Sequence, residues 1–150
     1  MRIALGSDHH GVELKRSLVE GLTAEGHEAI DLGPNDSEAV DYPDFAAKVS
    51  AMVSDGSADN GILICGSGVG MAITANKFPG VRAVNAHDQK EAEMSRLHNN
   101  ANVIALGASR IDAPEALAIV TTFITTDFEG GRHQRRVDSI AELEKENSPA

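Results

Sequence analysis

The sequence has few of the residues that mark disulfide-rich, aromatic-rich or membrane proteins. Its 150 residues include one cysteine and no tryptophan, and aromatic residues make up 3%. A single cysteine excludes an intramolecular disulfide and is compatible with a reducing compartment. The longest apolar stretch, residues 116–124, is too short to span a bilayer. We therefore expect an aliphatic core and a cytoplasmic protein.

Positive charge is also scarce. Thirteen lysines and arginines face 23 acidic residues, which gives a formal net charge of −10. An acidic surface repels nucleic acid and anionic membranes, so we expect neither as a partner. The first residues lack the basic and then apolar pattern of a signal peptide, in agreement with a cytoplasmic location. A site for an anionic ligand would need positive charge gathered against this overall field.

Short aliphatic runs alternate with helical patterns along the whole chain. The runs predict strands at residues 2–6, 29–33, 61–65, 81–85 and 103–107. Helical spacing predicts helices between them and a last, polar helix over residues 135–145. Strands that are apolar throughout are typical of a parallel sheet covered on both faces. We predict one α/β domain over residues 1–150, Rossmann-like, with a five-stranded parallel sheet flanked by helices and a frayed tail at 147–150.

Residues 65–70 read Cys-Gly-Ser-Gly-Val-Gly and connect the most apolar run to the next helix. Glycines at alternate positions let consecutive backbone N–H groups point at one anion beside a helix N-terminus. The alternative is a tight turn that merely needs glycine. Met71 stands where a dinucleotide fingerprint has its third glycine, a P-loop would need Gly-Lys-Ser/Thr, and Cys65 replaces the first glycine of a hydrolase elbow. None of these three motifs fits.

Cys65 ends the central apolar run at the mouth of this glycine loop. N–H dipoles close to a thiol favour its thiolate, which could act as a base or a nucleophile. The alternative is an inert small hydrophobe at the end of a buried strand.

Two further clusters carry residues capable of chemistry. Asp8, His9 and His10 follow the first strand, and ligands of open parallel sheets bind at such strand ends. Adjacent ligands without a distant third are a weak metal site, so we expect no metal. A histidine that moves protons, with Asp8 orienting it or holding a substrate hydroxyl, is the simpler interpretation. His10 is expected at the surface or behind the site.

Residues 130–136, Gly-Gly-Arg-His-Gln-Arg-Arg, hold the only concentrated positive charge. Arg132 and Arg136 are four residues apart, so on a helix they would share a face and could clamp one phosphate. A solvated basic turn is the alternative.

Taken in order, these segments resemble the family of ribose-5-phosphate isomerase B and the galactose-6-phosphate isomerase subunits. The resemblance covers essentially the whole chain. It is carried by Gly11 and by residues 6–9, 41–43, 62–70, 75–77, 80–83, 98–99, 102–103 and 130–133.

The resemblance implies isomerisation of ribose 5-phosphate to ribulose 5-phosphate through a cis-enediolate, a step of the pentose phosphate pathway, without metal or cofactor. The family's base is a cysteine that ends the third strand or a glutamate after the glycine loop. Here Cys65 is present and Met71 occupies the region of the glutamate. His98 would open the sugar ring with His9 assisting, and Ser67 would move a proton between the two oxygens. The residues implied in substrate binding are Asp8, His9, Gly66, Ser67, Gly68, Val69, Gly70, Asn99, Arg132 and Arg136.

The resemblance further implies a homodimer or dimer of dimers with the C-terminal helix at the subunit interface. One subunit would give Asp8, His9 and the Cys65 loop, and its partner would give His98, Asn99, Arg132 and Arg136. The family often has Gly-x-Arg after the fifth strand, but Arg110 comes one residue later here, so its contact with substrate stays open.

Two alternatives in function remain. One is an isomerase of allose 6-phosphate, galactose 6-phosphate or a tetrose phosphate, which would use the same residues. The other is a non-catalytic module of flavodoxin-like fold that binds a phosphosugar or nucleotide. Cys65 argues against a pure binder, since binding needs only the glycines and arginines.

Overall fold

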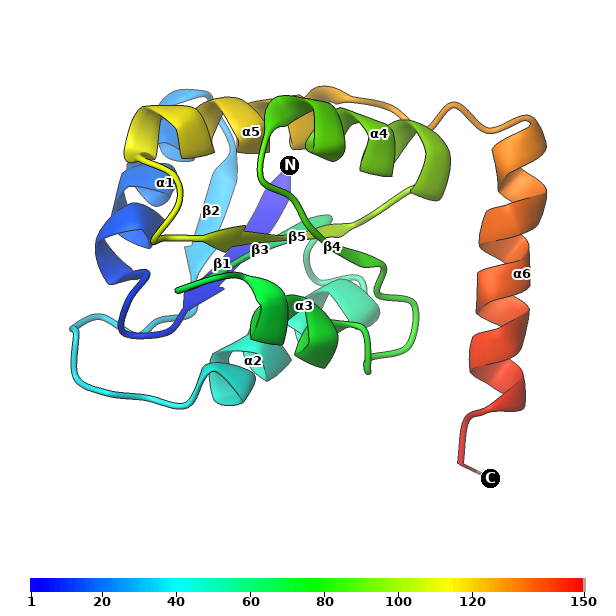
Figure 1. Ribbon diagram of the computed structural model, residues 1–150, viewed down its shortest axis with the longest axis horizontal. Coiled ribbons are helices and arrows are strands. Elements are labelled where there is room, and N and C mark those ends of the chain that lie inside the picture. Colours follow the sequence, from blue (N-terminus) through cyan, green and yellow to red (C-terminus); the bar gives the residue numbers. More distant parts are fainter. Residues whose placement is uncertain (150) are drawn as a thin grey trace.

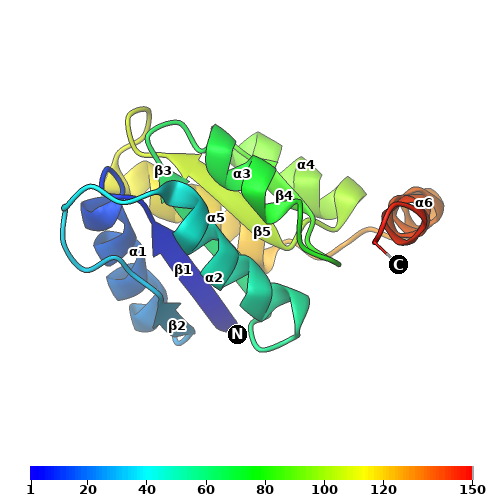
Figure 2. The same ribbon diagram turned by 90° about the horizontal axis from the view of Figure 1, so that it is seen from below.

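Residues 1–149, which the computed structural model describes, fold around a five-stranded parallel sheet (Figures 1 and 2). The predicted fold class is confirmed. Of the predicted tail at residues 147–150, Ala150 lies outside the described residues. The strand order is β2-β1-β3-β5-β4. The strands are β1 (Arg2–Ser7), β2 (Glu28–Asp31), β3 (Asn60–Cys65), β4 (Ala83–Asn85) and β5 (Val103–Gly107).

The direction in which the chain crosses the sheet decides which face each helix covers. The chain moves one way after β1 and β4 and the opposite way after β2 and β3. Because such crossovers are right-handed, α1 (Val12–Ala24) and α4 (Gln89–Asn99) lie on one face. By the same rule α2 (Tyr42–Ser54) and α3 (Val69–Ala75) lie on the other face, as Figure 1 shows. Helix α5 (Ala113–Thr125) packs between α1 and α4.

The central strand β3 is buried along its whole length, and its two faces have different side chains. Ile62 and Ile64 belong to the large aliphatic cluster under α1 and α5. Leu63 and Cys65 face the smaller cluster under α2 and α3. Glycines let α2 approach this second face closely, since a Cβ at Gly61 would lie 2.7 Å from a Val49 methyl group. The thiol of Cys65 is therefore on the α2 and α3 side of the sheet.

Several element boundaries differ by one to three residues from the sequence prediction, and two of them have a visible physical reason. Strand β4 begins at Ala83, two residues later than predicted, because the N–H of Arg82 is bound to the side chain of Asn102 instead of a strand neighbour. Helix α6 (Arg132–Glu146) begins three residues earlier than predicted. Its polar sequence gives no apolar periodicity to mark the first turn, and the positive φ of Gly130 and Gly131 ends the preceding segment directly before it.

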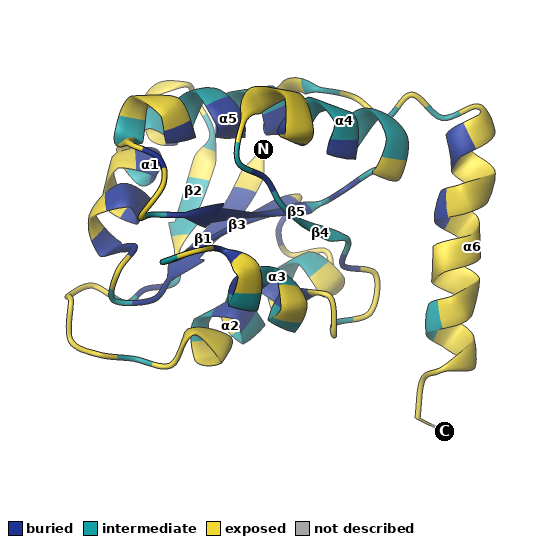
Figure 3. Ribbon diagram, viewed as in Figure 1, coloured by how far each residue is buried: buried dark blue, intermediate teal, exposed yellow. Residues whose placement is uncertain are grey.

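Helix α6 stands at the side of the molecule and touches the rest mainly through α4 (Figures 1 and 2). His133 and Val137 in its first turns are buried, but most of its surface is exposed (Figure 3). Ile140 and Leu143 are 48% and 58% exposed. Even so, none of the helices in residues 1–149 is long and apolar enough to cross a membrane.

An ion pair between a buried lysine and a partly exposed aspartate attaches α1 to the end of β2. Lys15 is 2% exposed, and its Nζ donates to Asp31 Oδ1 at 2.7 Å. The same carboxylate oxygen accepts the N–H of Gly33 at 2.9 Å. The pair thereby holds the start of the segment that leads from β2 to α2.

This arrangement makes the two partners unequal in their effect on stability. We expect Asp31→Asn to lower the free energy of unfolding by about 2–3 kcal/mol, because it leaves the Lys15 ammonium buried without a countercharge. Lys15→Met removes the charge and keeps a similar apolar stem, so its cost should be about 1 kcal/mol or less. Urea unfolding of both variants measures this difference, and equal costs would contradict it.

Candidate active site

The predicted site residues near the strand ends do come together in the structure. Cys65 ends β3, and the turn after β1 lies against it, because the N–H of Asp8 donates to the carbonyl of Ile64 at 3.0 Å. Gly11 permits this contact, since a Cβ there would lie 2.6 Å from Ile64 Cγ2. Residues 8–10 and 65–70 therefore form one cluster at the carboxyl ends of the strands.

Cys65 is 6% exposed and its sulfur accepts a hydrogen bond from the loop that follows. The N–H of Gly68 donates to Sγ at 3.0 Å. Gly68 has a φ of 85°, and a Cβ there would lie 2.6 Å from Asn85 Oδ1 and 3.0 Å from the Leu106 carbonyl carbon. Only glycine fits this left-handed, crowded position. A backbone donor aimed at the sulfur is the arrangement that a thiolate base would need.

The expectation that all N–H groups of the loop point at one anion needs correction. The N–H of Gly68 is bound to Cys65, and that of Val69 donates to Ser67 Oγ at 3.2 Å. Among residues 1–149 nothing accepts a hydrogen bond from the N–H groups of Gly66, Ser67 and Gly70. Three donors thus remain for a ligand, because the left-handed turn at Gly68 directs its N–H back to sulfur.

Residues after β5 hold the loop in place, a role that was not predicted from the sequence. The N–H of Ala108 donates to the Cys65 carbonyl at 2.9 Å, and Ser109 Oγ donates to the Gly66 carbonyl at 2.6 Å. A Cβ at Gly107 would lie 2.8 Å from the Ser67 carbonyl oxygen. Within the described chain, the exposed Arg110 makes no hydrogen bond or ion pair with its guanidinium. The serine inserted before Arg110 was the available signal for this anchor.

Tyr42 is a second residue that sequence reasoning missed. Its ring lies over Gly70, where a Cβ would overlap the ring carbons and lie 2.9 Å from the hydroxyl oxygen. The side chain is 40% exposed. Tyr42 belongs to one of the segments that carry the family resemblance, but nothing in the sequence indicated which loop it would contact.

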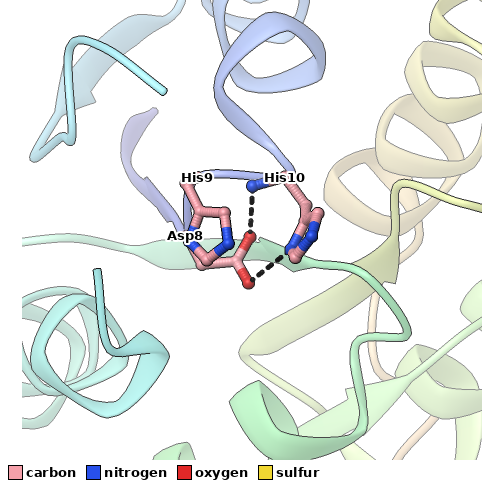
Figure 4. A group of neighbouring side chains, drawn as sticks. All are labelled: Asp8, His9 and His10. Carbon is pink, nitrogen blue, oxygen red and sulfur yellow. Dashed lines mark hydrogen bonds and ion pairs between the residues drawn. The ribbon is translucent and has the colours of Figure 1, made fainter. Parts of the chain in front are cut away.

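In the Asp8–His10 turn, the Asp8 carboxylate contacts His10, and His9 has a different hydrogen-bond partner (Figure 4). Asp8 Oδ1 accepts the N–H of His10 at 2.9 Å, and Oδ2 lies 3.4 Å from His10 Nδ1. The His9 and His10 rings are 4.2 Å apart. His9 Nδ1 accepts the N–H of Val40 at 3.2 Å. These three side chains are close enough to hold a metal ion, but hydrogen bonds already engage each of them.

A second cluster gathers around the end of α4 and the start of α6. The rings of His98 and His133 stack at 4.2 Å, and the Glu129 carboxylate faces both, at 3.9 Å and 3.8 Å from their Nε2 atoms. These three could also hold a metal ion. Burial lowers the pKa of His133, the nearby His98, Arg132 and Arg136 lower it further, and Glu129 opposes them. His133 was not predicted as a site residue, although it lies in residues 130–133, one of the segments that carry the family resemblance.

The two clusters lie at opposite ends of the strands. A helix that follows a parallel strand runs back along it, so the last turn of α4, with His98 and Asn99, lies at the amino ends of the strands. The 11 residues of α4 span roughly 16 Å. Figures 1 and 2 likewise place α6, with Arg132 and Arg136, away from the tip of the β5 arrow. One chain therefore does not bring these four residues to Cys65.

Comparison with known proteins places this geometry in context. The family model for ribose/galactose isomerases matches residues 3–140. The chain is 45% identical to ribose-5-phosphate isomerase B of Escherichia coli K12, over 96% of this chain and 97% of that protein. It is similar to the structure of ribose-5-phosphate isomerase B from Clostridium thermocellum, with a TM-score of 0.96 and 48% identity over 99% of this chain and 100% of that one. It is also similar to the Mycoplasma genitalium enzyme with bound ribulose 5-phosphate, with a TM-score of 0.94 and 46% identity over 97% of each chain.

The lowered pKa of His133 makes stability depend on pH. The folded chain binds this proton less readily than the unfolded chain, whose histidine has the ordinary value of 6.5. The free energy of unfolding should therefore fall as pH drops below about 6.5. We expect His133→Gln to show a smaller fall between about pH 7.5 and about pH 5.5, measured by urea unfolding. An unchanged pH dependence in this variant would contradict the account.

Proposed function

The chain belongs to the ribose/galactose isomerase family, and we propose that Cys65 is the base with which it interconverts ribose 5-phosphate and ribulose 5-phosphate. The relatives named as ribose-5-phosphate isomerase B support this substrate pair, and a similar structure contains ribulose 5-phosphate. The assignment of the base rests on one observation, the hydrogen bond from Gly68 N–H to Cys65 Sγ. Met71 cannot replace it, since its thioether is no base and its side chain is fully buried.

The loop around Cys65 has the groups that enediolate chemistry needs. The Cys65 thiolate takes the proton from C2 of the open-chain aldose and returns it to C1. Negative charge then develops on the substrate oxygens, where the free N–H groups of Gly66, Ser67 and Gly70 can stabilise it. Ser67 Oγ accepts the N–H of Val69, which leaves its hydroxyl proton free to pass between the two oxygens.

The remaining residues come from a second copy of the chain in our proposal. His98 takes the proton that the anomeric hydroxyl loses and gives it to the ring oxygen as the C1–O bond breaks, and the Glu129 carboxylate 3.9 Å away stabilises the imidazolium that forms in between. Arg132 and Arg136 share a face of α6 and bind the phosphate, and Asn99 comes from the end of α4. Phosphate binding then positions the reacting carbons.

An isologous homodimer is the smallest assembly that completes this site. It is supported by α6, which stands away from its own sheet and exposes Ile140 and Leu143. These two side chains line a cavity of about 600 Å³ between α6, β4 and α4 that also includes Asn99. A dimer of dimers would contain the same pairs of chains.

Three further expectations stay predictions. The mechanism needs no metal or cofactor, because a thiolate, N–H groups and guanidinium groups supply the charge that it requires. The cytoplasmic location stays a prediction, and so does the absence of nucleic acid and membrane partners. Contact between substrate and Arg110 is not part of the proposal, since Ser109 occupies the position beside the loop.

Replacement of the base tests the role of Cys65. We expect Cys65→Ser to lower kcat by about 10²- to 10⁴-fold with little change in KM, because a serine hydroxyl is not ionised at neutral pH. Circular dichroism and urea unfolding show whether the variant keeps its fold. Near-normal kcat in a folded Cys65→Ser chain would rule out the assignment.

Mixing two inactive variants tests whether the site is shared. Cys65→Ser and His98→Gln chains, each inactive alone, should recover about a quarter of normal activity when they are co-expressed in equal amounts. Half of the dimers would then be mixed, and each mixed dimer has one intact site of two. A site built within one chain would give no recovery, and the proposal of a shared site would be wrong.

A further inference from the structure

His9 is oriented by the main chain of a distant segment. The N–H of Val40, 31 residues further along the chain, donates to His9 Nδ1 with a nitrogen–nitrogen distance of 3.2 Å. The adjacent Asp8 carboxylate is occupied by the N–H and the ring of His10 (Figure 4). Asp8 was expected to orient a histidine, and the histidine that its carboxylate contacts is His10.

The segment that carries Val40 is attached at both ends. At its start, the carbonyl of Gly33 accepts the N–H of Ser7 at 3.1 Å, and the N–H of Gly33 donates to Asp31. At its end, Asp41 is the N-cap of α2. The donor that reaches His9 is thus presented by a part of the chain with its own attachments to β1 and α2.

A backbone N–H can only donate a hydrogen bond, so this bond determines which nitrogen of His9 carries the proton. Nδ1 has to offer its lone pair to Val40, and the proton of the neutral imidazole is then on Nε2. In this form His9 offers a ligand a hydrogen-bond donor. It lacks the free lone pair at Nε2 that a general base needs.

We propose that the Val40 N–H is a positioning group that holds His9 as the Nε2–H tautomer, a donor to an oxygen of the substrate. His9 is half-buried in the turn that lies against the end of β3, where a ligand at the Cys65 loop is its neighbour. Its ring also lines an open cavity of about 920 Å³ on the α2 side, which includes no residue of the Cys65 loop. That the ligand is a sugar phosphate rests on the proposed function. The proposal assigns ring opening to His98 alone, because His9 in this tautomer accepts no proton at Nε2.

The tautomer can be measured without any assay of activity. The full chain is labelled with ¹⁵N-histidine, and the side-chain nitrogens are observed by long-range proton–nitrogen correlation at a pH where the imidazole is neutral. His9→Gln identifies the His9 signals by their loss. We expect Nδ1 of His9 to resonate as an unprotonated nitrogen and Nε2 as a protonated one. The opposite pattern, or averaged shifts on both nitrogens, overturns the proposal and leaves the isomerase function untouched.

Two substitutions at one position isolate the backbone donor. Val40→Pro removes the N–H of residue 40, whereas Val40→Ala shortens the side chain and keeps that N–H. We expect the His9 nitrogens of Val40→Pro to show averaged shifts, and its kcat/KM to be about three- to tenfold lower than that of Val40→Ala, as the loss of one hydrogen bond implies. Equal tautomers and equal kcat/KM in the two variants would overturn the proposal. If Val40→Pro does not fold, the tautomer of His9 in the unmodified chain still decides whether the proposal holds.

Discussion

The hydrogen bond from Gly68 N–H to Cys65 Sγ is the contact on which the proposed chemistry depends. It forms only because Gly68 adopts a left-handed conformation that turns its N–H back towards the end of β3. That conformation leaves no space for a side chain, since a Cβ there would lie 2.6 Å from Asn85 Oδ1 and 3.0 Å from the Leu106 carbonyl carbon. The bonds from Ala108 and Ser109 to the loop carbonyls then fix the loop against β5. A strand end, a glycine and a neighbouring strand thus combine to place a donor on one sulfur atom.

The parallel direction of the strands has a consequence for assembly. Each helix that links two parallel strands has to run back along the sheet, so its last residues lie at the amino ends of the strands, opposite to groups at the carboxyl ends. Cys65 lies at the carboxyl end of β3, and His98 lies in the last turn of α4. An isomerase that uses both, together with the arginines of α6, needs a second chain to bring them together. The position of α6, apart from its own sheet and with apolar residues exposed, agrees with that requirement.

Sequence reasoning succeeded where one local pattern determines the outcome. The aliphatic runs and their spacing predicted all five strands, and the glycines of residues 66–70 predicted a loop with N–H groups available to a ligand. It failed where the decisive contact joins segments that no local pattern relates. The contacts of Val40 with His9, of Tyr42 with Gly70 and of Ser109 with Gly66 each depend on where loops meet after folding. The first turn of α6 was missed for another reason, because residues 132–135 are all polar and give no apolar position to mark where the helix begins.

The central claim is that a proton, removed and returned by Cys65, moves between the two carbons of the substrate through an enediolate. The most direct measurement is the reaction in deuterium oxide, with the product analysed by NMR for deuterium at C1 and C2. A base that exchanges its proton with solvent before returning it introduces deuterium at the carbon that receives the proton. We expect deuterium to be incorporated in this way. A product that contains no deuterium and keeps all of the substrate's own hydrogen would indicate hydride transfer and contradict the account.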